Sequence, residues 1–136
     1  MTRKPAPAPR HKASHVGAPA IFALTQACQD INRAFRGYGC YLVGSALERP
    51  DWRDVDVRLI MSDAEFAALF PDARDRGSWE FDPRWLLLTI AISERLSKLT
   101  GLPIDFQFQP QTHANEQHKG KRSALGLIFA PKSAEE

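Results

Sequence analysis

Two short segments, DVDVRLIM (54–61) and IDFQFQ (104–109), constrain the fold most, because apolar and polar residues alternate along both. The apolar positions are Val55, Val57, Leu59 and Met61 in the first segment and Ile104, Phe106 and Phe108 in the second. Side chains of a β-strand point alternately to its two faces, so this period of two predicts strands. We therefore expect two strands, each with one buried face and one polar face.

Helical spacing of apolar residues marks a first helix over about residues 19–36. Its apolar stripe includes Leu24, Cys28 and Ile31, which places Cys28 in the core, and Gly37 stands where a C-terminal cap is expected.

A second helix is predicted between the Asp82-Pro83 pair, a capping residue and a first-turn proline, and Gly101. The first half of RWLLLTIAISERLSKLTG is apolar almost all round. Such a helix is expected to lie centrally in the core.

The remaining segments are shorter. CYLV (40–43) predicts a buried strand, and the capping box from Ser62 to Glu65 predicts a short helix ending near Phe70. We expect a charged loop over 71–81 and a weakly patterned tail from 111, in which LGLIFA (125–130) adds an edge strand. The predicted fold class is α/β (α+β), with a short mixed sheet and helices mainly on one face.

Composition limits the alternatives. The 136 residues, with 43% hydrophobic and 25% charged side chains, suit one globular domain, which we place at residues 19–130. Residues 1–18 form a basic arm rich in Pro and Ala that is expected to be disordered, and 131–136 a flexible tail. A net charge of +2 is too small to indicate nucleic-acid binding by itself. With no run of about 18 apolar residues, no apolar signal segment and two cysteines, the expected location is the cytoplasm, away from membranes.

The polar faces of the two predicted strands carry Asp54, Asp56 and Asp105. If the strands are neighbours, three carboxylates come close together, a ligand set suited to Mg²⁺ or Mn²⁺. The alternative is that these are solvated residues whose charge Arg58 partly neutralises. Gly44-Ser45 follows a predicted strand, and a Gly-Ser turn leading into a helix presents backbone N–H groups to a phosphate.

The ordered set Val43-Gly44-Ser45, then Asp54-Val55-Asp56-Val57, then Ile104-Asp105-Phe106 resembles the DNA polymerase β nucleotidyltransferase superfamily, particularly its minimal members. The stretch RPDWRDVDV is similar to the PxSDIDL run of that group. The likeness covers residues 40–108 as three motifs. It departs in the loop ALERPDWR, which is shorter and carries Glu48 where the family often has an Arg-Gly pair.

The resemblance implies an enzyme that moves a nucleoside monophosphate from an NTP, most often ATP, to a hydroxyl of a protein, an RNA or a small molecule. It implies that Asp54 and Asp56 hold two Mg²⁺ (or Mn²⁺) ions. Asp105 would join the second ion and lower the pKa of the acceptor hydroxyl, while Gly44 and Ser45 would bind the phosphates. Small members often belong to toxin–antitoxin or phage-defence modules, which favours a protein or tRNA acceptor.

Five basic residues are candidates for phosphate or acceptor contacts: Arg49, Arg53, Lys119, Lys121 and Arg122. A solvated charged loop explains the same residues equally well or better. Two further hypotheses stay open for the whole chain. One is a catalytically silent nucleotidyltransferase-like module that binds a protein or nucleic acid, and the other is a structural α+β protein whose aspartates face water.

Overall fold

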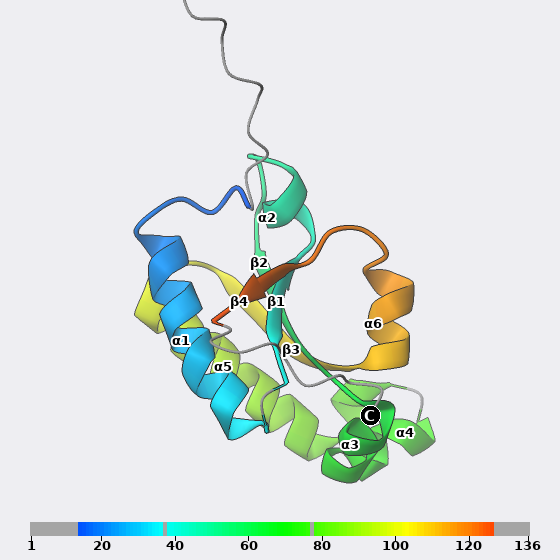
Figure 1. Ribbon diagram of the computed structural model, residues 1–136. Helices are drawn as coiled ribbons and strands as arrows, with labels where there is room; N and C mark the ends of the chain where they lie inside the picture. The colour runs from blue at the N-terminus through cyan, green and yellow to red at the C-terminus, as the bar shows by residue number, and fades with distance from the viewer. Residues whose placement is uncertain (1–13, 37, 77, 127–136) are drawn as a thin grey trace, which may run out of the picture.

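A four-stranded mixed sheet runs through the centre of the computed structural model (Figure 1), which describes residues 14–36, 38–76 and 78–126. The strands are β1 (Cys40–Val43), β2 (Val55–Met61), β3 (Ile104–Pro110) and β4 (Ser123–Leu125). The helices are α1 (Ala20–Ala34), α2 (Ser45–Glu48), α3 (Asp63–Leu69), α4 (Pro71–Arg76), the 3₁₀ turn η1 (Trp79–Phe81), α5 (Pro83–Thr100) and α6 (Gln111–Gln117). The expected α+β class is confirmed.

The strand order is β3-β2-β1-β4. β1 pairs antiparallel with β2 and with β4, whereas β2 and β3 run parallel. A parallel pair needs a crossover connection, and the segment from α3 to α5 supplies it. Because β2 and β3 run in the same direction, their first residues lie together at one end of the sheet.

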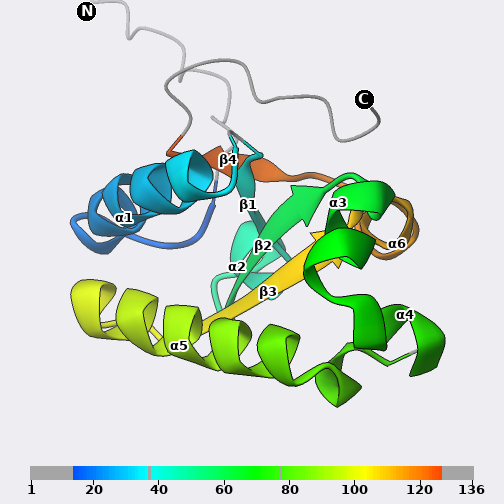
Figure 2. The same cartoon turned by 90° about the horizontal axis from the view of Figure 1, so that it is seen from below.

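One face of the sheet is apolar and lies against α1 and α5 (Figure 2). Val55, Val57 and Leu59 of β2 are completely buried on this face, as the alternation predicted, although Arg58 and Ile60 on the opposite face are buried as well. Phe106 and Phe108 of β3 are equally buried and meet edge to face. Cys28 of α1 lies in the same core, as its place on the apolar stripe predicted. The core therefore occupies one side of the sheet.

Both predicted helix caps on the crossover are confirmed. The Ser62 hydroxyl accepts the backbone N–H of Glu65 at the start of α3, and the Asp82 carboxylate accepts the N–H groups of Arg84 and Trp85 at the start of α5. Gly101 ends α5 in the left-handed conformation, with φ of 74°. These local signals set where the crossover helices begin and end.

Two sequence-based expectations were wrong. The segment 71–81, expected to be a loop, contains α4 and η1, because Pro71 fits a first helical turn and buried Ala73 anchors that turn in the core. The half of α5 that is apolar all round is not central to the core. It buries Trp85 and Thr89 but exposes Leu87 and Ile90, since the sheet contacts only one side of the helix.

The two ends of the chain are partly described. The tail from 111 forms α6 and then β4, which starts earlier than the expected edge strand at 125–130; residues 127–130 and the tail 131–136 lie outside the described residues. Of the expected arm, residues 1–13 also lie outside them. Within 14–18, Val16 is buried and the His15 N–H donates to the Ala46 carbonyl at 2.7 Å. These last arm residues therefore pack on the domain. Gly37, the expected cap of α1, is not described either.

Candidate active site

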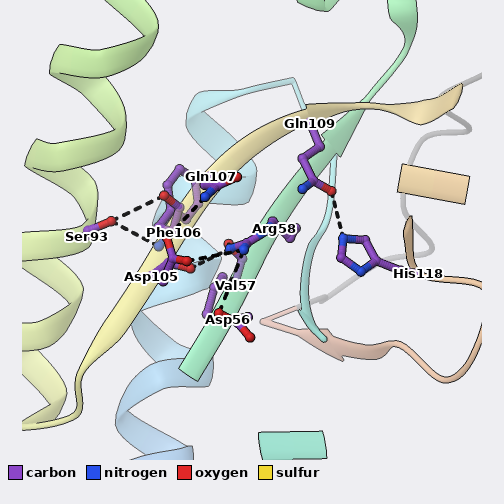
Figure 3. A network of polar contacts seen from close by, with 9 residues as sticks. All are labelled: Asp56, Val57, Arg58, Ser93, Asp105, Phe106, Gln107, Gln109 and His118. Atoms are coloured by element: carbon purple, nitrogen blue, oxygen red, sulfur yellow. Dashed lines mark hydrogen bonds and ion pairs between the residues drawn. The ribbon is translucent and has the colours of Figure 1, made fainter. Parts of the chain in front are cut away.

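Asp56 and Asp105 stand side by side on the polar face of the sheet (Figure 3). The parallel pairing of β2 and β3 sets them in the same register, Asp56 beside Asp105. Both side chains are only partly covered, with exposed fractions of 25% for Asp56 and 45% for Asp105. The sequence predicted that these two acids meet if their strands are neighbours. β2 and β3 are neighbours, and the two acids lie side by side.

Gly44 lies against this acidic pair. It lies between β1 and α2, with φ of 76° and ψ of −154°, a conformation that side-chain-bearing residues rarely adopt. A Cβ atom at Gly44 would lie 2.3 Å from the Asp56 Oδ2 atom. Glycine is therefore required here by both the backbone conformation and the position of the Asp56 carboxylate.

Arg58 lies between the two carboxylates. Its Nη2 atom is 3.3 Å from Asp105 Oδ2 and 3.8 Å from Asp56 Oδ1. Its Nη1 atom donates to the main-chain carbonyls of Asp105, at 2.6 Å, and Val57, at 3.1 Å. The Nε atom is buried and has no hydrogen-bond partner among the described residues. The guanidinium is thus held in place by the backbone and serves as the counter-charge of the pair.

The electrostatic environment of the pair affects the pKa of Asp56. Burial raises the pKa of Asp56; Arg58 opposes that rise, and the carboxylates of Asp105 and Asp54 add to it. Two or three negative charges around one guanidinium leave the cluster with an excess of negative charge. Another cation would relieve this excess.

Asp54 precedes β2 and is exposed. It lies near enough to raise the pKa of Asp56, yet among the described residues no three Asp, Glu, His or Cys side chains are grouped closely enough to hold a metal ion. Ser45 opens the short helix α2 and is half-buried. The structure thus brings together Asp56, Asp105 and Gly44, with Asp54 and Ser45 at the margin.

The five basic candidates differ in their surroundings. Arg49 and Arg53 are exposed beside the acidic end, and Arg49 forms a loose ion pair with Asp51 at 3.8 Å. Lys119 and Lys121 are exposed in the turn after α6. Arg122 instead donates to the carbonyls of His118 and Ala114, and so holds the end of α6. Arg122 therefore has a structural role that its sequence context did not indicate.

The polar face continues from the acidic pair to His118 (Figure 3). The imidazole Nε2 lies 2.9 Å from Oε1 of Gln109, a buried residue of β3. Burial, followed by the charges of Arg58 and Arg122 and by His113, lowers the pKa of His118 to about 4. His118 is therefore neutral at physiological pH.

Sequence reasoning treated Arg58 only as a charge on an amphipathic strand and gave His118 no role. The signal for Arg58 was present, since a third polar residue two positions after Asp56 must share its face. No comparable signal existed for His118, because its contact with Gln109 depends on how the chain turns after α6.

No protein-family model, curated protein or solved structure matches this chain. Within the described ranges, no helix is both long and apolar enough to span a membrane.

Proposed function

We propose that this chain is a metal-dependent nucleotidyltransferase of the minimal DNA polymerase β type, which moves a nucleoside monophosphate from an NTP to a hydroxyl of a protein, an RNA or a small molecule. One observation carries the proposal. Asp56 and Asp105, distant in sequence, share one register of neighbouring strands, and Asp56 packs against Gly44 at the turn that leads into Ser45. This is the spatial order that the three motifs imply.

The residues present suit one divalent cation. Mg²⁺ is usually held by one or two carboxylates, with water and substrate phosphates completing its shell. Asp56 and Asp105 supply two such carboxylates, and a bound cation would offset the burial and the neighbouring carboxylates that raise the pKa of Asp56. In the proposal Asp54 is a further ligand when a nucleotide brings a second ion. A bound ion would neutralise phosphate charge and lower the pKa of the acceptor hydroxyl.

The residues of the chain have separate tasks in this scheme. The carboxylate of Asp105 accepts the proton of the attacking hydroxyl. The Ser45 hydroxyl and the backbone N–H groups after Gly44 donate to the phosphates, and Arg49 and Arg53 at the rim attract the triphosphate. The guanidinium of Arg58 keeps Asp56 and Asp105 at a constant separation through its backbone contacts. Pyrophosphate leaves as the new phosphodiester bond to the acceptor forms.

The direct test is ligand-induced stabilisation. Each of the four NTPs with Mg²⁺ or Mn²⁺ is added to the protein, and the melting temperature is measured. Binding to the folded state alone at 100 times Kd adds about 2.7 kcal/mol. We expect Asp56→Asn and Asp105→Asn to abolish the shift. Asp51→Asn, a change at an acid that is 81% exposed in the loop before β2, should keep it. Unchanged melting with every nucleotide and both cations contradicts the proposal.

Transfer itself is measured with α-labelled NTP and two acceptors, the protein's own hydroxyls and bulk tRNA. Label should enter an acceptor with the wild-type chain and with Asp51→Asn but not with Asp56→Asn. Stabilisation by NTP without transfer to any acceptor would reduce the proposal to nucleotide binding.

Arg58 favours a second candidate, the catalytically silent module. A guanidinium with only 9% of its side chain exposed already neutralises part of the charge that a metal ion would neutralise. Under this alternative, NTP and Mg²⁺ leave the melting temperature unchanged. The protein instead binds nucleic acid with strong salt dependence. This binding is lost when the basic residues 1–13 are removed and does not change with Asp56→Asn.

A further inference from the structure

The outer side of α5 is an apolar surface that the proposed function does not use. Leu87 is 68% exposed, Ile90 49% and Leu86 41%, and neighbouring Ala91 is also exposed. These four residues, Leu86, Leu87, Ile90 and Ala91, are called the α5 outer face below. Figures 1 and 2 show α5 along the outside of the molecule, and no described element lies beyond it. Adjacent exposed apolar side chains of this kind mark interaction surfaces, whereas isolated ones do not.

The charges around the α5 outer face indicate what covers it. Residues alternately three and four positions apart fall on one stripe of a helix. On α5 this stripe consists of Arg84, Leu87, Ala91, Glu94 and Lys98, all of them exposed. Its apolar centre thus has the cation Arg84 toward the helix start and, toward the helix end, the anion Glu94 followed one turn later by the cation Lys98.

The charge order along this stripe is complementary to that of a second copy of α5 that runs in the opposite direction. In a second α5 that runs antiparallel and crosses near residue 89, Leu87 faces Ala91 of the second copy, and the small Ala91 leaves room for the leucine. The same register places Arg84 opposite Glu94 of the second copy. A parallel arrangement would instead set Arg84 against Arg84 and Glu94 against Glu94, which is unfavourable.

We infer that the α5 outer face is the interface of a symmetric, antiparallel homodimer of this chain. A two-fold interface requires one patch that is complementary to its own copy, and the stripe meets that requirement. The inner side of α5 packs on the apolar face of the sheet, where Ser93 accepts the Phe106 N–H at 3.0 Å. The polar face with Asp56 and Asp105 is the opposite face, so the dimer leaves it open and is independent of the proposed function.

Sedimentation equilibrium of the full chain over a range of concentrations tests the inference. We expect a species of twice the 15.2 kDa chain mass at high concentration, with dissociation on dilution. Leu87→Glu should give a monomer with an unchanged melting transition at low concentration, since Leu87 is mostly exposed. Phe22→Glu on α1, where Phe22 is 69% exposed outside this face, should keep the dimer.

Charge reversal tests the antiparallel register. Glu94→Arg should weaken the dimer by about tenfold, because two Arg84–Glu94 contacts become repulsive. The double variant Arg84→Glu, Glu94→Arg should restore wild-type association. A wild-type chain that is monomeric at every concentration overturns the inference, as does a dimer that Leu87→Glu leaves intact. Failure of the double variant to recover association overturns the antiparallel pairing.

Discussion

Two regions of the molecule hold a covered carboxylate, and their surroundings differ in kind. At the start of α5, Asp82 is only 2% exposed and accepts three backbone N–H groups, from Arg84 at 2.8 Å, Trp85 at 2.9 Å and Asp72 at 3.1 Å. On the polar face of the sheet, Asp56 lies among other carboxylates, with the Arg58 guanidinium at 3.8 Å.

The burial of Asp82 has a structural reason in the fold, whereas the burial of Asp56 does not. Asp82 satisfies donors that a helix start leaves unpaired, so its burial stabilises the crossover. Asp56 is surrounded by like charges, and burial raises its pKa. A partly exposed carboxylate whose charged form is disfavoured by its surroundings is a candidate for a functional site. Four substitutions, two of them with a control variant, test this contrast and the rest of the polar face.

The largest effect is expected from Gly44→Ala. The residue has φ of 76°, and the new methyl group would lie 2.3 Å from Asp56 Oδ2. We expect a loss of about 3 kcal/mol in the free energy of unfolding, from backbone strain and the displaced carboxylate. Urea unfolding measures it.

Gly101→Ala is the matched control, because Gly101 has φ of 74° with nothing near its Cβ position. Left-handed strain alone should cost about 1–2 kcal/mol there. Equal losses at the two positions would show that Asp56 does not pack against Gly44 as described.

Asp82→Ala should remove about 2 kcal/mol, since the cap of α5 and the acceptor for the Asp72 N–H are both lost. Asp82→Asn keeps an acceptor oxygen and should lose less. Chemical denaturation with both variants measures the difference. An alanine variant as stable as the wild type would mean that the cap contributes nothing and would remove the contrast with Asp56.

Asp56→Asn should change the free energy of unfolding by no more than about 0.5 kcal/mol at neutral pH. The raised pKa of Asp56 means that the folded state binds its proton more tightly than the unfolded chain. The contribution of the protonated Asp56 to the free energy of unfolding is therefore fully present below the ordinary pKa of 3.8. It is lost as the pH rises through the higher pKa of the folded state. The stability difference between wild type and variant, followed against pH, should fall across this window. A loss as large as that of Asp82→Ala would assign Asp56 a structural role.

The smallest effect concerns the far end of the polar face. Because the pKa of His118 is lowered to about 4, the folded state disfavours its proton. Stability from this group is present above the ordinary pKa of 6.5 and declines as the pH falls toward 4. His118→Gln should remove that decline and change nothing at neutral pH. An NMR titration of the His118 imidazole with a midpoint near 6.5 would contradict the described environment.

Much of the candidate site follows from local pattern. Alternation along 54–61 and 104–109 places Asp56 and Arg58 on one strand face and Asp105 on another, and the polar residues Ser62 and Asp82 mark helix starts that the structure confirms. The segment 71–81 was missed because its mixed charges obscure a first turn that Pro71 and buried Ala73 support. The position of His118 was missed because no periodic pattern precedes it.

Local pattern alone is enough to predict which residues share a face, because side-chain direction in a strand or helix repeats over two to four residues. The position of Asp56 beside Asp105 is visible only in the folded chain, since the register of β2 and β3 joins residues far apart in the sequence. The fold also shows which surroundings each side chain meets. It also decided that Arg58 lies between them, because a long side chain takes its position from the backbone carbonyls that it meets. Likewise, α5 is apolar on nearly every side in its first half, and only the packing of the sheet selected which side is buried.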